Sequence, residues 1–238
     1  MTFTLPTLTA WKKKRFLEHA ERVLTAQQQM QSLDGKNILH YTLNELPFHE
    51  HMIHYPKGDR IDHSTGAQYF YHCDREDQDQ EEHGHFHCFI RYDHIPKHIK
   101  PKPLSDWNKY IENPMTHLVA IAMNRFGQPT RLFSVNRWVT EEVWYDTHHT
   151  PNFIRRFKMT KEDSAYWQVL DQWIEGMIRL FSPQIEWLNH QRDRFMNEHL
   201  TTNPDINPYE DTSIEVISDI NISLPQQIEW IMNSTCKK

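Results

Sequence analysis

The sequence predicts an α+β fold in which helices at both ends of the chain cover an antiparallel sheet formed by the middle. Three observations support this prediction. Apolar residues recur at helical spacing near the N-terminus, β-prone aromatic and aliphatic runs dominate between about residues 68 and 140, and helical spacing returns after residue 160. Since neither a repeat nor a linker separates these regions, we expect residues 1–238 to form a single domain.

The first segment is expected to be a helix. Thr9 can cap its start, apolar residues from Trp11 to Met30 recur at helical spacing, and Gly35 can end it. The following residues, 40–67, combine two glycines and two prolines with short polar residues, so they are expected to form irregular loops.

The middle of the chain is expected to contain four strands in two successive hairpins. They are predicted at residues 68–73, 83–92, 116–124 and 130–140. The run of acidic residues at 74–82 connects the first pair, and a turn with Gly127 connects the second. This order indicates an antiparallel meander, either curved or barrel-like.

The last third of the chain returns to helical spacing. One helix is expected from a cap at Thr160 to about Phe181, and a second is expected to open with Ser182 as cap and Pro183 in its first turn. Residues 213–223 are β-like, and residues 224–232 suit a short final helix.

The composition excludes several classes of protein. The net charge is -6 and only 6 residues are glycine, so neither a nucleic-acid binder nor a glycine-rich phosphate cradle is expected. No apolar run is long enough for a membrane span, and the basic residues follow the N-terminal apolar segment, the reverse of a signal peptide. We therefore expect a cytoplasmic protein whose cysteines, Cys73, Cys88 and Cys236, are reduced thiols.

Histidine is the unusual component of this sequence. The chain has 17 histidines, and eleven of them fall between His40 and His98. Within "EHGHFHCF" three histidines stand at every second position, and side chains at i, i+2 and i+4 of a strand share one face. His83, His85 and His87 are therefore expected on one face of a strand, together with Phe89.

A row of imidazoles suits a transition metal. Alternate residues of a strand are about 6.6–6.8 Å apart, so one pair can lean toward a single ion while neighbouring strands supply further ligands. If Cys73 pairs with Glu82, the preceding strand places His72 opposite His83, whereas a one-residue slip would turn His72 to the other face; a strand on the other side can contribute His117. The predicted ligands are thus His72, His83, His85, His87 and His117, for iron, copper or zinc.

The same alternation predicts the surroundings of this site. Val119, Ile121 and Met123 are expected to share a face with His117, and Phe70 and Phe89 to complete an apolar wall. His49, His51 and His54 form a second, less regular group that predicts a site more weakly. The alternative to a metal site is a polar strand whose imidazoles bond to carbonyl and carboxylate groups.

Two stretches, "EHGHFH" and "NRWVT", resemble an uncharacterised bacterial family, a domain of unknown function. The resemblance covers roughly His54 to Trp144 and implies a cytoplasmic bacterial protein without assigned catalytic residues. It directs attention to Arg137 and Trp138, which are expected on opposite faces of a strand end. They can bind an anionic or planar ligand, or instead form a structural salt bridge and a packed indole.

Three functions remain open from the sequence. The first is a metal-dependent enzyme that acts on a small molecule. The second is a non-catalytic metal carrier or a partner subunit of another protein, and the third is a histidine network without metal. The sequence contains neither the H-E-x-x-H motif of zinc proteases nor the G-x-S-x-G motif of serine hydrolases, and it predicts neither substrate nor oligomeric state.

Overall fold

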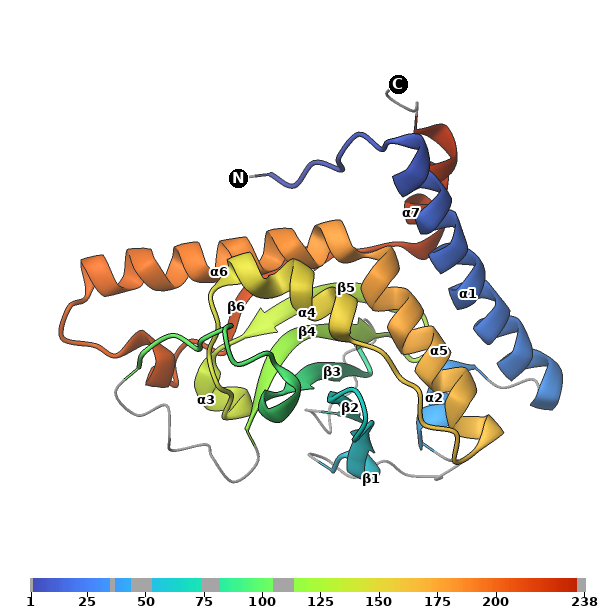
Figure 1. Cartoon of the computed structure of the whole chain (residues 1–238), viewed down its shortest axis with the longest axis horizontal. Helices are drawn as coiled ribbons and strands as arrows, with labels where there is room; N and C mark the ends of the chain where they lie inside the picture. The colour runs from blue at the N-terminus through green and yellow to red at the C-terminus, as the bar shows by residue number, and fades with distance from the viewer. Residues whose placement is uncertain (1, 35–36, 44–52, 74–81, 105–113, 235–238) are drawn as a thin grey trace.

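The computed structural model describes residues 2–34, 37–43, 53–73, 82–104 and 114–234. Its centre is an antiparallel meander whose strands follow one another in chain order, so the sheet is open and not closed into a barrel (Figure 1). The strands are β1 (Tyr55–Ile61), β2 (Ala67–His72), β3 (Gly84–Arg91), β4 (Met115–Met123), β5 (Pro129–Val135) and β6 (Val216–Asn221). The α+β prediction is therefore confirmed.

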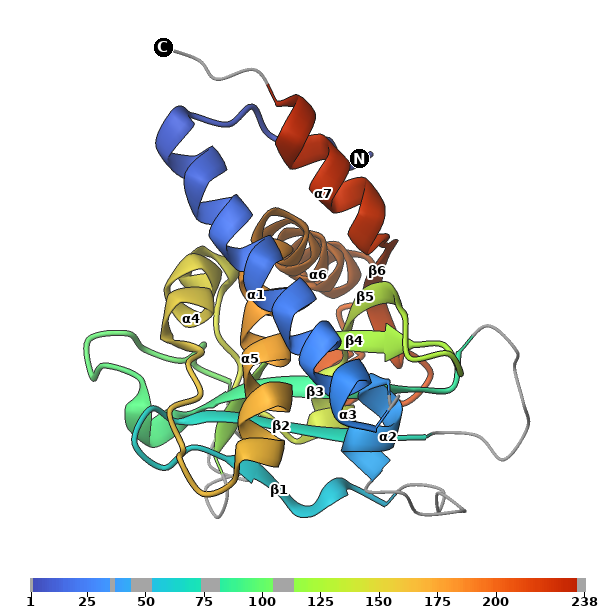
Figure 2. The ribbon, with the colours of Figure 1, turned by 90° about the vertical axis from the view of Figure 1, so that its right-hand side faces the viewer.

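The described ranges contain seven α-helices, with helices at both ends of the chain. They are α1 (Ala10–Asp34), α2 (Ile38–Leu43), α3 (Arg137–Thr140), α4 (Thr150–Arg156), α5 (Ala165–Leu180), α6 (Ser182–Thr202) and α7 (Leu224–Asn233). Helices α4, α5 and α6 lie over the same face, and α1 runs alongside α5 (Figures 1 and 2). None of the helices in the described ranges has the length and apolar character that a membrane span needs.

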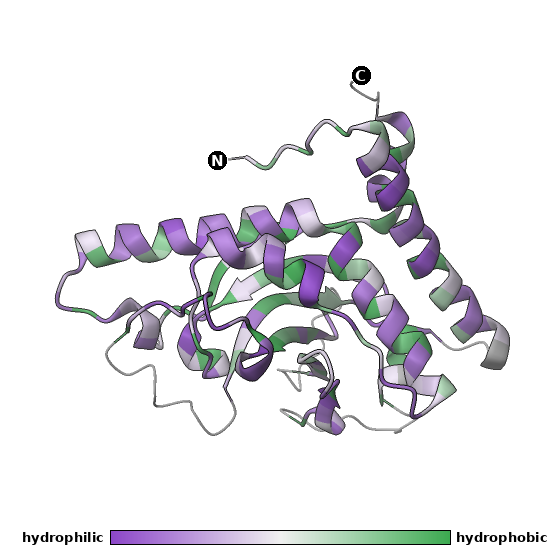
Figure 3. Ribbon diagram, in the orientation of Figure 1, coloured by the Kyte–Doolittle hydropathy of each residue, from purple (hydrophilic) through white to green (hydrophobic). Residues whose placement is uncertain are grey.

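The main core lies between the sheet and these helices. Trp173 of α5 contacts Phe86 of β3, and both are fully buried. Hydropathy colouring shows apolar residues along the strands and polar residues over much of α1 and α6 (Figure 3). Gly176 lets α1 come close to α5, because a Cβ at this position would lie 2.7 Å from the side chain of Val23.

Several predicted elements differ from the structure. The segment 40–67, expected to be loops, contains the end of α2 and all of β1. A bulge in β1 interrupts the two-residue alternation by which a strand is recognised. The strand expected to reach Thr140 ends at Val135, because the Asn136 side chain accepts a hydrogen bond from the Arg137 N–H and starts α3. Helix α5 begins only after Ser164, and Ser182 is the first residue of α6, not its cap.

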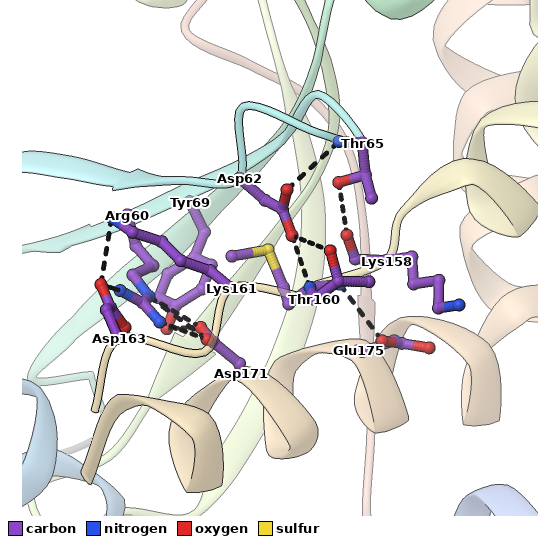
Figure 4. Close-up of polar contacts among 11 residues, drawn as sticks. Arg60, Asp62, Thr65, Tyr69, Lys158, Thr160, Lys161, Asp163, Asp171 and Glu175 are labelled. Carbon is purple, nitrogen blue, oxygen red and sulfur yellow. Dashed lines mark hydrogen bonds and ion pairs between the residues drawn. The ribbon is translucent and has the colours of Figure 1, made fainter. Parts of the chain in front are cut away.

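Polar side chains fasten the β1–β2 hairpin to the segment before α5 (Figure 4). Thr160, expected as a helix cap, instead donates to the Asp62 carboxylate from both its N–H and its hydroxyl. Nearby, the Arg60 guanidinium binds Asp171 at 2.6 Å, and the Tyr69 hydroxyl donates to the same carboxylate at 2.7 Å. These contacts hold the end of β1 against α5 and the segment before it.

Candidate metal centre

Four histidines lie on the face of the sheet opposite Trp173. They are almost completely buried: His72 is 7% exposed, His85 4%, His87 2% and His117 4%. In the register of the sheet, His72 of β2 is opposite His85 of β3. The expected partner of His72 was His83, two residues away, so the strand faces were predicted correctly although the register was not.

Three of these imidazoles could share one ion. His72, His85 and His87 each offer a ring nitrogen, and these three atoms lie within 4.8 Å of one another. The closest pair, Nε2 of His72 and Nε2 of His85, is separated by 2.8 Å. Nitrogens bound to one tetrahedral ion at 2.0–2.1 Å are about 3.3 Å apart, so small side-chain rotations would fit the cluster to an ion.

A carboxylate orients His85 from behind. Oε1 of Glu82 lies 3.3 Å from Nδ1 of His85, and its other oxygen accepts a hydrogen bond of 2.8 Å from Arg131. Burial opposes ionisation of Glu82, but the hydrogen bonds with His85 and Arg131 hold its pKa below the usual value. An ionised carboxylate only accepts, so the proton of His85 sits on Nδ1 and its Nε2 presents a lone pair to the cluster.

His87 is supported by a second imidazole. Its Nδ1 lies 3.0 Å from Nε2 of His117, which leaves the other nitrogen of His87 for the cluster. Burial, reinforced by His85 and His117, holds the pKa of His87 well below its usual value. Burial and then Arg192 lower the pKa of His117 to about 3. Both rings are therefore neutral, the state in which imidazole binds metals.

A bulge in β4 brings His117 to this face. Cys88 pairs with Val119 and Phe89 pairs with His117, so Leu118 is an extra residue between them. Asn189 of α6 donates a hydrogen bond of 3.1 Å to the carbonyl oxygen of Leu118. The bulge thus reverses the alternation before Val119, and His117 joins the face of Ala120.

The predicted apolar wall is consequently only half right. Val119, Ile121 and Met123 belong to the core beneath the helices and not to the face of His117. Phe70 and Phe89 do border the imidazoles, at ring-centroid distances of 5.2 Å and 6.0 Å from His87. Phe133 of β5, which the sequence did not predict, also borders the site: its ring centroid lies 5.0 Å from that of His85.

His83 does not join the cluster. It precedes the first residue of β3, and its Nδ1 lies 2.7 Å from the hydroxyl of Tyr71 and 3.8 Å from the sulfur of Cys73. Tyr71 and Cys73 belong to the core on the helix-covered face. The placement of His83 with His85 is therefore wrong, because the strict alternation of a strand does not extend to this residue.

Arg137 and Trp138 lie in α3, so their expected arrangement on a strand is wrong as well. Arg137 is 1% exposed, and its guanidinium lies 3.7 Å from the carboxylate of Glu210. The indole N–H of Trp138 donates to the carbonyl oxygen of Ile214. Both side chains thus contact the segment before β6. His49 and His51 lie outside the described residues.

The sequence did not predict the charged residues that form hydrogen bonds around the cluster. Glu82 directly precedes His83 and was assigned to the acidic connector, and Arg131 comes from a strand two positions away in the sheet. The buried Glu142, which accepts a hydrogen bond of 2.7 Å from the backbone N–H of His117, was missed as well. Carboxylates of this kind are recognisable only when their distance from the histidines is known.

Fold and site together define an α+β protein with a buried three-histidine cluster on one face of an antiparallel sheet. The chain belongs to the family described as a domain of unknown function, DUF6969, whose model matches residues 17–222. This match confirms the resemblance to an uncharacterised family. No curated protein and no solved structure matches the chain.

Proposed function

We propose that this protein binds a transition metal ion through His72, His85 and His87. The observation that carries the proposal is the convergence of three ring nitrogens within 4.8 Å from buried side chains of two neighbouring strands. Burying several polar rings costs free energy unless their nitrogens are satisfied, and a shared ion would satisfy three of them at once. Neutral imidazoles suit iron, copper or zinc.

The outer contacts of the cluster support this proposal. Ligating histidines usually donate their second N–H to a carboxylate or another acceptor, which fixes the ring and raises its basicity. Glu82 is placed to do this for His85, and His117 for His87. Three protein ligands leave a coordination position open, and an ion in such a position supplies Lewis-acid or redox chemistry. We therefore favour a metal-dependent enzyme for a small molecule, in the cytoplasm, over a carrier, since a carrier needs an exposed and exchangeable site.

A specific observation favours one alternative, a histidine network without metal. The pairs His72–His85 and His87–His117 are already close enough to share one proton each. Such a network would be satisfied internally and would bind no ion tightly. A carrier or partner subunit would differ from both in releasing its metal to another protein.

The experiment that tests the proposal is elemental analysis of untagged protein, expressed with added iron, copper and zinc. We expect near-stoichiometric metal in the wild type and its loss in the double variant His85→Ala/His87→Ala. The matched control is His148→Ala/His190→Ala, which removes two exposed imidazoles and should retain the metal. His85→Gln, a milder change, covers the case in which the double variant does not fold.

Thermal unfolding separates the metal site from the metal-free network. A ligand that binds only the folded state stabilises it, so the correct ion should raise Tm in the wild type and in the control. Absence of metal from the wild type, together with an unchanged Tm after each metal is added, would contradict the proposal.

A further inference from the structure

His54 lies beside the cluster, just before β1. Its ring stacks on Phe70 with centroids 3.6 Å apart and planes 7° apart, and it meets the ring of His72 edge-on at 6.0 Å. The side chain of His54 is 43% exposed, whereas His72 and His85 are 7% and 4% exposed. His54 therefore lies between the buried imidazoles and the solvent.

A chain of hydrogen bonds fixes where the proton of His54 resides. Arg91 donates to Oε1 of Gln68 at 2.9 Å, and Nε2 of Gln68 donates to one oxygen of Asp59 at 2.7 Å. The other oxygen of Asp59 lies 2.8 Å from Nδ1 of His54. Arg91 can only donate, which turns the amide N–H of Gln68 toward Asp59. The Asp59 carboxylate accepts from both sides, so the neutral His54 ring donates to it and carries its proton on Nδ1.

A bulge in β1 places Asp59 at this position. Tyr55 pairs with Tyr71 and Arg60 pairs with Tyr69, so four residues of β1 bulge out between two registered pairs. Within the bulge Gly58 and Asp59 both have positive φ, 81° and 61°. The next residue, Arg60, is anchored on the helix-covered face by Asp171 (Figure 4). Bulges of this kind redirect side chains and are frequent beside active sites.

We propose that His54 contacts a small molecule bound at the open coordination position of the metal centre. Nε2 of His54 accepts a hydrogen bond from an O–H or N–H group of that molecule. This inference rests on the proposed function. Among the described residues, Nε2 of His54 has no hydrogen-bond partner. Asp59, Gln68 and Arg91 are positioning residues, which keep this nitrogen an acceptor. The ligand class follows: it carries a hydrogen donor next to its metal-binding atom.

The first test reads the protonation of His54 directly. In protein labelled with ¹⁵N-histidine and loaded with zinc, long-range ¹H–¹⁵N spectra distinguish protonated, free and metal-bound ring nitrogens. His54→Gln assigns the signals. We expect Nδ1 of His54 to be protonated and Nε2 to be free, and Asp59→Asn to abolish this preference. A zinc-bound or protonated Nε2 would overturn the proposal.

The second test measures the preference for a hydrogen donor. The probes are acetohydroxamate, which chelates through oxygen and retains an N–H, and azide, which has no hydrogen. We expect His54→Phe, which preserves the stacking on Phe70, to weaken acetohydroxamate binding to cobalt-loaded protein about 5- to 10-fold. Azide binding should change less than 2-fold. The control His63→Phe, at an exposed position of the following turn, should change neither.

The outcomes separate the two proposals. Equal losses for both probes, or no loss for either, would overturn the role of His54 although metal is bound. If the protein takes up none of iron, copper, zinc or cobalt, the proposed function fails, and this inference fails with it. The ¹⁵N spectrum of metal-free protein still shows in that case whether Asp59 fixes the proton on Nδ1.

Discussion

Glu82→Gln should weaken metal binding without removing a metal ligand. The carboxylate of Glu82 lies 3.3 Å from Nδ1 of His85 and 2.8 Å from the guanidinium of Arg131. Glutamine can keep one of these contacts with its oxygen, but its amide group then faces the other partner as a donor. Either His85 loses its acceptor or Arg131 faces an N–H group.

The size of the effect follows from these contacts. Loss of an outer-shell partner of a ligating histidine typically lowers metal affinity about 10- to 100-fold, or about 1.4 to 2.7 kcal/mol. Glu82 is partly exposed, with 27% of its side chain accessible, so solvent can replace part of the lost contact. We therefore expect the lower half of this range, about 10- to 30-fold.

Competition with a chromophoric chelator measures this change as a shift in the zinc Kd. Glu229→Gln is the matched control, because it removes a carboxylate from an exposed position of α7. Circular dichroism and Tm establish that Glu82→Gln folds. A zinc Kd within 3-fold of the wild type in a folded Glu82→Gln protein would refute the assignment of Glu82 to the outer shell of His85.

Three further predictions concern the scaffold of the site. Gly84→Ala should lower stability by about 1–3 kcal/mol and reduce metal content, because its Cβ would collide with the carbonyl oxygen of His72; urea unfolding and elemental analysis check this. Asp171→Asn should destabilise the fold by about 3–5 kcal/mol in urea unfolding, because it leaves the buried Arg60 without its main counter-ion; a loss below 1 kcal/mol would contradict this. Burial raises the pKa of Glu142 from 4.5 to about 7. The protonated carboxyl therefore stabilises the fold fully below pH 4.5, by about 3 kcal/mol, and this contribution is lost as the pH rises through 7. Urea unfolding between pH 4.5 and 8 should therefore show a shallower decline in Glu142→Gln than in the wild type, and parallel curves would refute the assignment.

Local patterns were enough to predict most of the fold. Alternation within β3 placed His85 and His87 on one face. His72 of β2 joined them because the assumed register differs from the observed one by two residues, and an even shift preserves the face. The helix at 10–34 followed from its cap and its apolar spacing. Where these local rules held without interruption, the expected faces agree with the structure.

The errors arise where one extra residue changes the period. The bulge at Leu118 reverses the face of Val119, Ile121 and Met123 relative to His117, and no composition signal marks it. Its stabilising contact comes from Asn189, 71 residues away in the sequence. The bulge in β1 likewise made a strand resemble a loop. Such features depend on tertiary contacts that a single sequence does not display.

Hydrogen bonds to carboxylates give the ring nitrogens an orientation that alternation alone could not provide. The bond from His85 to the Glu82 carboxylate leaves the Nε2 lone pair of His85 facing His72. The chain from Arg91 to Asp59 likewise leaves Nε2 of His54 as an acceptor. A ring nitrogen that presents a lone pair to its neighbours needs a cation or a hydrogen donor opposite it, as Nε2 of His85 does beside His72. In the metal-free network His72 must serve as that donor; an ion would take over this role and allow His72 to become a ligand. The arrangement of acceptors, more than the number of histidines, is therefore the reason to test for metal first.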